Sequence, residues 1–226
     1  MIEVSVQGLF APLLESGPDI SKWEEHTEGL RNAHRELMAR RGKDLGFYDL
    51  PANETIVKSI ESEVQRMRSI GDDLLVLGIG GSGPTKRIPS KIFLDVINKI
   101  SKIKKCKFFL ATGKNEEEQI ILREIQSSKF ENLCYPLDNF SIKEVLPIIK
   151  CCDLSICNDS SFSHLSAALG IKTITLMADT PLIYGSYNSN MFPILPDGEQ
   201  TVSHNTLGKE KINPEKIFNK LIEISN

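Results

Sequence analysis

Two loops of this chain carry the residue types that bind phosphate groups. The first covers residues 78–86 and reads GIGGSGPTK, directly after the apolar run 74–77. Glycines let a backbone approach a phosphate closely, while Ser82, Thr85 and Lys86 offer two hydroxyls and a positive charge. The spacing matches neither the GxxxxGK[ST] phosphate loop nor GxGxxG. The pattern alone therefore leaves two interpretations open, a phosphate-binding loop and a simple tight turn.

The second loop covers residues 157–164 and reads CNDSSFSH. It follows another apolar run, and its Asp and Ser residues cap a predicted helix that begins near Ser161. Free N–H groups and the positive end of the helix dipole favour an anion at such a point. His164, about one turn further, is placed either to donate to a phosphate oxygen or simply to pack. A plain helix cap is the commoner arrangement, and diphosphate binding would use the same residues.

Both loops need a scaffold that brings the ends of strands together. From Asp73 onward, short apolar runs alternate with segments of helical length, which predicts an α/β fold with a Rossmann-like, doubly wound parallel sheet. Ligands bind beyond the carboxyl ends of strands in such sheets. The irregular segment 178–211 is also expected to border a site. The predicted strands are 73–78, 106–112, 132–135, 153–157, 172–177 and, weakly, 192–195; the predicted helices are 89–101, 115–127, 141–150, 161–169 and 214–224.

Residues 1–71 are predicted to be mostly helical, with helices over 19–42 and about 54–70. We therefore expect two domains, this helical segment over 1–71 and a Rossmann-like domain over 72–226. Residues 1–82 contain 6 Arg and 3 Lys, whereas residues 83–226 contain 2 Arg and 16 Lys. Such a change in charge usage indicates a boundary, and we favour a chain joined from two sources over ordinary drift between two regions.

Composition excludes several classes of partner. The net charge of −3 gives no general attraction to nucleic acid or anionic membranes. We expect no transmembrane segment and no leader, hence a cytoplasmic location. The cysteines lack the paired spacing of a zinc site, so no metal and no cofactor are expected. The five cysteines are Cys106, Cys134, Cys151, Cys152 and Cys157.

Three motifs resemble those of family 9 glycosyltransferases, the heptosyltransferases of lipopolysaccharide core synthesis. Residues 83–89 (GPTKRIP) are similar to the family's GPxKRWP-type turn, with Ile88 in place of the aromatic residue. Residues 158–170 resemble its NDSGxxHxAAALG stretch, with Ser161 in place of glycine. Residues 178–187 resemble its closing segment around the sugar donor.

The resemblance implies that residues 83–226 form the donor-binding half of a GT-B fold, which takes ADP-heptose or a similar nucleotide sugar. It assigns no catalytic residue. The residues implied for the phosphates and the donor sugar are Gly83, Thr85, Lys86, Asp159, Ser160, Ser161 and His164; those implied for the nucleoside are Gly113, Asn115 and Glu116.

Residues 1–82 resemble the N-terminal part of glucose-6-phosphate isomerase, through residues 23–30, 47–51 and 77–82. As an alternative, this implies a sugar-phosphate site at Gly80, Gly81 and Ser82, although no base for isomerisation is recognisable. The two resemblances together predict a chimera joined after Ser82, with the acceptor domain replaced and sugar transfer impaired, or else a fusion without function. The apolar helix faces of residues 1–71 predict self-association.

Overall fold

The computed structural model describes residues 20–40, 58, 62, 66 and 73–225. The chain divides into two compact units, Met1–Ser59 and Ile60–Asn226. In the first unit, helix α1 covers Ile20–Ala39, which confirms the helix predicted over 19–42. The second predicted helix, 54–70, lies outside the described residues except at positions 58, 62 and 66, which are helical.

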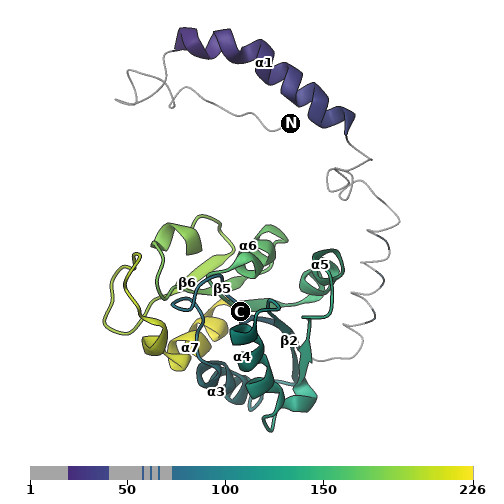
Figure 1. Ribbon diagram of the computed structural model, residues 1–226. Coiled ribbons are helices and arrows are strands. Elements are labelled where there is room, and N and C mark those ends of the chain that lie inside the picture. The colour runs from purple at the N-terminus through teal and green to yellow at the C-terminus, as the bar shows by residue number, and fades with distance from the viewer. Residues whose placement is uncertain (1–19, 41–57, 59–61, 63–65, 67–72, 226) are drawn as a thin grey trace. The chain divides into compact units, whose positions relative to one another are not determined.

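The described part of the second unit contains one sheet of six parallel strands (Figure 1). The strand order is β3-β2-β1-β4-β5-β6, which confirms the doubly wound fold. The order reverses between β1 and β4, which pair directly, Gly78 lying beside Cys157. A ligand-binding crevice is therefore expected beyond the ends of these two strands. The strands are β1 (Asp73–Gly78), β2 (Cys106–Ala111), β3 (Cys134–Pro136), β4 (Leu154–Asn158), β5 (Thr173–Leu176) and β6 (Met191–Ile194).

Helices cover both faces of the sheet (Figure 1). Alternate residues of β1 point to opposite faces, so that Leu75 and Leu77 join one core while Leu74 and Val76 join the other. This two-sided burial explains why the strands are continuous apolar runs in the sequence. The first core is covered by α3 (Ser90–Ile100), α4 (Glu116–Gln126) and α7 (Pro214–Ser225); the second is covered by α5 (Ile142–Cys151) and α6 (Ser161–Ala168).

Local signals in the sequence account for where these helices begin. The Asn115 side chain accepts a hydrogen bond from the Glu118 N–H at 2.9 Å and caps α4. Glu144 accepts a hydrogen bond from the Ser141 N–H at 2.8 Å and closes a capping box at α5. Pro214 occupies the first position of α7, where a missing N–H has no cost.

The strand predicted over 132–135 begins later than expected, at Cys134. A 3-10 turn covers Glu131–Leu133, and the Leu133 N–H donates to the Phe130 carbonyl oxygen at 2.9 Å. This local hydrogen bond takes the N–H that a strand would offer to its neighbour. The weak strand predicted at 192–195 is confirmed as β6.

Gly78 is expected to be intolerant of any side chain, because β1 and β4 approach closely there. A Cβ added at Gly78 would lie 2.7 Å from the Cys157 Cβ and closer still to its sulfur. We expect Gly78→Ala to lower the free energy of unfolding of the α/β unit by about 1–3 kcal/mol, measured by chemical denaturation. Gly83→Ala is the control, because its Cβ would meet only the Thr85 hydroxyl at 4.0 Å. Equal stability of the two variants would contradict this explanation.

Candidate functional site

The two loops that the sequence singles out meet at the point where the strand order reverses. Asn158, the last residue of β4, is completely buried. Its side-chain N–H groups donate to the carbonyl oxygens of Ile79 and Gly80, at 2.9 and 3.2 Å. One buried amide therefore fixes the glycine loop after β1 against the loop after β4.

A single carboxylate, that of Asp159, gathers side chains from several elements. The Lys86 ammonium lies 3.1 Å from Oδ2, and the Thr180 hydroxyl donates to the same oxygen at 2.5 Å. His164 Nε2 lies 3.7 Å from Oδ1. Asp159 is 4% exposed, so its charge depends on these partners in place of water. The loops after β1, β4 and β5 and helix α6 thus converge on one group.

His164 is also oriented from its other ring nitrogen. His164 Nδ1 lies 3.0 Å from the Tyr187 hydroxyl, and the two rings stack with their centroids 5.7 Å apart. Tyr187 follows the short 3-10 helix Leu182–Gly185. The closing segment therefore fixes the imidazole that the sequence places at the start of α6.

The side chains of Lys86, Asp159 and His164 line a cavity of about 360 Å³. At its wall, the Ser160 hydroxyl is buried and has no hydrogen-bond partner among the described residues. The N-terminus of α6 and the Lys86 ammonium both favour an anion there. The lining residues are Ser82, Lys86, Asp159, Ser160, Ser161, His164, Thr180, Tyr184 and His204.

A second cavity, of about 400 Å³, adjoins the first. Ser82, Ser160 and Ser161 line both. Together the two cavities provide an extended site at the carboxyl edge of the sheet. The second cavity differs from the first by its glycines and by two apolar side chains, Ile142 and Phe162. The second cavity is lined by Gly80, Gly81, Ser82, Thr112, Gly113, Glu118, Ile142, Ser160, Ser161 and Phe162.

Four of the predicted site residues line neither cavity. Asn115 caps α4, and Glu116 pairs with Arg123 at 2.5 Å. Gly83 lies in the turn that the Lys86 N–H closes by donating to the Gly83 carbonyl oxygen. Thr85 bonds through its hydroxyl to another carboxylate, that of Asp179. Of the residues predicted for the nucleoside, only Gly113 lines the second cavity.

Sequence reasoning missed Glu118, a buried carboxylate below the glycine loop. It accepts hydrogen bonds from the Gly81 N–H and the Thr112 hydroxyl, both at 3.1 Å, and from the Gly113 N–H. Arg87 Nε donates to the Gly81 carbonyl oxygen at 2.9 Å and lies 3.8 Å from Glu118 Oε1. The available signal was the Asn-x-x-Glu spacing at the start of α4, which is typical of a capping motif.

Hydrogen bonding keeps Glu118 ionised despite its burial. Burial by itself raises the pKa of this carboxyl group. The Gly81 N–H, the Asn115 side chain, the Gly113 N–H and the Thr112 hydroxyl together outweigh that effect, and the pKa of Glu118 lies below its ordinary value of 4.5. The carboxylate can therefore hold the loop at neutral pH.

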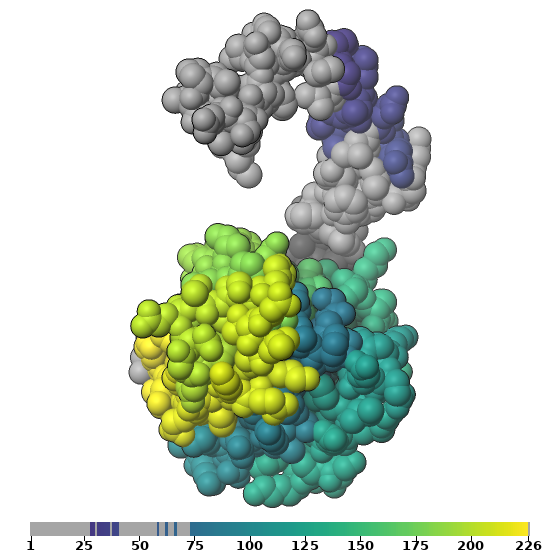
Figure 2. Space-filling view, turned by 60° about the vertical axis from the view of Figure 1, so that its left-hand side comes forward, coloured from purple at the N-terminus to yellow at the C-terminus, as the bar shows by residue number. Residues whose placement is uncertain are grey.

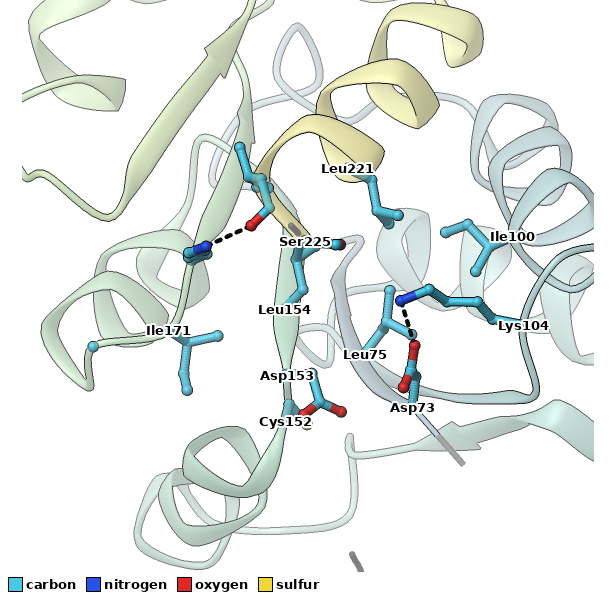
Figure 3. Close-up of a pocket in the computed structure, with 13 residues that line it drawn as sticks. Asp73, Leu75, Ile100, Lys104, Cys152, Asp153, Leu154, Ile171, Leu221 and Ser225 are labelled. Carbon is cyan, nitrogen blue, oxygen red and sulfur yellow. Dashed lines mark hydrogen bonds and ion pairs between the residues drawn. The ribbon is translucent and has the colours of Figure 1, made fainter. Parts of the chain in front are cut away.

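Another cavity, of about 460 Å³, lies at the opposite, amino-terminal edge of the sheet (Figure 3). Its charged side chains are already bonded within the protein: Lys104 to Asp73 at 2.8 Å, and Asp153 to the Leu74 N–H at 2.8 Å. None of the predicted site residues lines this cavity, and of the three motifs only Gly170, at the end of the 158–170 stretch, does so. It is therefore separate from the site described above.

The described residues contain no group of three or more His, Cys, Asp or Glu side chains that could hold a metal ion. All five cysteines are buried, and none of them forms a disulfide. Burial raises the pKa of Cys157 to about 11 and that of Cys134 to about 12, which makes both poor nucleophiles. Over the described part of the chain, no helix is both long and apolar enough to span a membrane.

A doubly wound parallel sheet with two loops meeting at its switch point defines the Rossmann-like class of α/β domains. Within that class the family is settled by a match of residues 35–212 to glycosyltransferase family 9 (heptosyltransferase). The chain belongs to this family.

Curated relatives and solved structures agree with this assignment. The chain is 28% identical to lipopolysaccharide heptosyltransferase 1 of Campylobacter coli over 74% of its own length and 49% of that protein. It is 30% identical to lipooligosaccharide heptosyltransferase 2 of Campylobacter jejuni over 69% of its own length and 52% of that protein. The chain thus spans about half the length of these relatives.

The fold resembles that of E. coli ADP-heptose lps heptosyltransferase II, with a TM-score of 0.59 and 18% identity over 74% of this chain and 51% of that one. It also resembles E. coli heptosyltransferase WaaC with ADP, with a TM-score of 0.56 and 17% identity over 69% and 45%. These likenesses confirm the GT-B-like sheet.

The comparisons give no support to the isomerase resemblance or to a chimera. The family match begins at residue 35 and runs through Ser82, where the sequence predicts a junction. The change in Arg and Lys usage therefore falls inside a stretch that matches one family. Charge usage on a protein surface is weakly constrained by the fold, which is why it is a poor indicator of origin here.

Glu118→Gln tests whether this buried carboxylate holds the glycine loop. At pH 7 we expect the variant to lose about 1–3 kcal/mol of stability, because a neutral amide is a weaker acceptor and brings donors that find no partner. The pKa of Glu118 is lower in the folded state than its ordinary value of 4.5. The ionised carboxylate therefore contributes its full stabilisation above pH 4.5, and this stabilisation is lost as the pH falls through the folded-state pKa. The gap between wild type and variant should therefore narrow in acid, measured by urea denaturation from pH 7 to 3.

Glu124→Gln, at an exposed position of the same helix, is the matched control and should change stability little at any pH. A Glu118→Gln variant as stable as this control would contradict the proposed role.

Proposed function

We propose that residues 73–225 bind the diphosphate and nucleoside of an ADP-linked sugar, ADP-heptose in the first place, as the donor for heptosyl transfer in lipopolysaccharide-type synthesis. The observation that carries this proposal is the convergence of Lys86, Thr180 and His164 on the buried carboxylate of Asp159, beside the N-terminus of α6. The family membership and the relatives' names support the choice of sugar nucleotide.

The two adjoining cavities suit the two halves of such a donor. The cavity with Lys86 and His164 provides positive groups and hydroxyls for a diphosphate. The cavity beside Gly80, Gly113 and Phe162 has a more apolar lining, which suits a nucleoside. A diphosphate placed at Ser160 and Ser161 would join them, because these residues line both cavities.

The same groups would help the donor to react. When a glycosyl group leaves a nucleoside diphosphate, negative charge grows on the departing phosphate oxygen. Lys86 and the first N–H groups of α6 stabilise charge at that position without rearrangement. Asp159, in this proposal, keeps the Lys86 ammonium in place before and during the reaction.

Complete sugar transfer also needs an acceptor hydroxyl and a base that removes its proton. Among the described residues, the carboxylates next to the cavities are already committed: Asp159 to Lys86, and Glu118 to backbone N–H groups. We therefore propose that the described residues provide donor binding and that transfer by them alone is weak or absent. The division at residues 71 and 72, self-association through residues 1–71 and a cytoplasmic location stay predictions.

Calorimetry with ADP, ADP-heptose and UDP-sugars tests donor binding. Wild type is expected to bind ADP and ADP-heptose more tightly than UDP-sugars. Lys86→Ala should weaken ADP binding by about tenfold to hundredfold, because a hydrogen bond to a charged group contributes about 1.5–3 kcal/mol. Asp159→Asn should also weaken it, since Lys86 loses the charge that positions it.

Lys105→Ala is the matched control, because Lys105 is an exposed lysine just before β2, at the opposite edge of the sheet. It should bind ADP like wild type. Donor binding at this site is refuted if wild type gives no heat with any of these nucleotides, or if the Lys86 and Lys105 variants behave alike.

Isomerisation of fructose 6-phosphate is the alternative that the sequence suggests, and we expect it to be absent. The reaction needs a free base beside C1 and C2 of the sugar. Beside Gly80 and Gly81 the carboxylate is Glu118, which is engaged by the Gly81 and Gly113 N–H groups. A coupled assay for glucose 6-phosphate should show no turnover above background. Turnover that copurifies with the chain would favour isomerisation over donor binding as its function.

A further inference from the structure

A short segment after β6, residues 203–208, adopts a strained backbone next to the candidate site. We call this segment the strap. Two of its residues other than glycine have positive φ angles, Asn205 at 76° and Leu207 at 52°. Asn adopts this conformation more readily than most residues, but it is costly for a bulky side chain such as that of Leu207 and persists there only where surrounding contacts enforce it.

The contacts that enforce it centre on Asp179, which is 8% exposed. Its carboxylate accepts a hydrogen bond from the Leu207 N–H at 2.8 Å, and it is also bonded to the Asn205 N–H and the Thr85 hydroxyl. Lys209, directly after the strap, donates to the Pro84 carbonyl oxygen at 3.0 Å. The strap is thereby tied to the turn that carries Lys86, and Figure 2 shows the yellow atoms of this part of the chain against the blue atoms that follow β1.

This arrangement places His204, at the exposed end of the strap, on the wall of the cavity that Lys86, Ser160 and His164 also line. Burial raises the pKa of Asp179, but the hydrogen bonds from Leu207 and Thr85 outweigh burial and His204 adds a favourable charge interaction, so that this pKa lies below its ordinary value. Asp179 is therefore ionised and able to hold the strap at neutral pH.

We propose that His204 is a further binding residue for the diphosphate of the donor, and that Asp179 is the positioning residue that holds His204 at the cavity. The inference rests on the proposed function, because it takes the cavity at Lys86 to be the diphosphate site. The imidazole N–H donates to a phosphate oxygen from a part of the chain separate from both glycine and serine loops. In this proposal, the strained backbone of the strap orients the His204 side chain toward the ligand.

The charged groups around His204 are Asp179 behind it and Lys86, Asp159 and His164 in the cavity. Lys86 and His164 are both bound to Asp159. His204, the third basic group of this cavity, makes no such bond to Asp159 among the described contacts. A ligand can therefore bind His204 without competing with Asp159.

The test is calorimetry of the full chain with ADP and with adenosine. His204→Gln should weaken ADP binding about tenfold, the loss expected for a hydrogen bond to a charged oxygen, and should leave adenosine binding unchanged. Asp179→Ala should weaken ADP binding to a similar extent, and the double variant should be no weaker than either single variant, because Asp179 acts through His204. Asp179→Asn, which keeps an acceptor oxygen for the Leu207 N–H, should recover most of the affinity.

His34→Gln, at an exposed position of α1, is the control and should bind like wild type. Unchanged ADP affinity in His204→Gln overturns the inference while leaving the proposed function intact. Additive losses in the double variant overturn the positioning role of Asp179. Wild type that fails to bind ADP overturns the proposed function itself, and thermal unfolding of each variant shows whether a loss of binding reflects a loss of folding.

Discussion

The buried carboxylate of Asp159 is the constraint on which the candidate site depends. A charge removed from water is tolerated only when it is paired and hydrogen-bonded, and here the partners come from other loops: Lys86 after β1 and Thr180 after β5. Satisfying one charge therefore fixes three loops relative to one another. The parallel sheet allows this, because the carboxyl ends of β1, β4 and β5 lie at the same edge.

The same pairing shapes the electrostatics of the cavity. Asp159 offsets much of the charge of Lys86, so the attraction for an anion also depends on the N-terminus of α6 and on groups outside the pair. In the proposed function, a bound diphosphate would share Lys86 with Asp159 without displacing Asp159. Glu118 and Asp179 are also buried carboxylates that need partners, and backbone N–H groups supply them. Glu118 holds the glycine loop in this way, and Asp179 holds the strap.

Much of this arrangement was predictable from the sequence, and the exceptions have a common cause. The strands were found because their apolar runs end at polar or glycine residues such as Gly78 and Asn158, and the two loops were found because their residue types suit phosphate. Glu118 and Asp179 are held by contacts with distant segments: Glu118 bonds to Gly81, 37 residues earlier, and Asp179 bonds to Leu207, 28 residues later. No local pattern encodes such a contact. Asn115 and Glu116, which the resemblance implies for the nucleoside, stay predictions; in the structure their side chains cap α4 and pair with Arg123.

The measurement that tests the central claim most directly is a crystal structure of this chain with ADP bound. We predict that the diphosphate lies between the Lys86 ammonium and the first N–H groups of α6, about 3 Å from each, with Asp159 still paired to Lys86. ADP bound elsewhere, for example in the cavity at the amino-terminal edge of the sheet, or a diphosphate that leaves Lys86 without contact, would contradict the account.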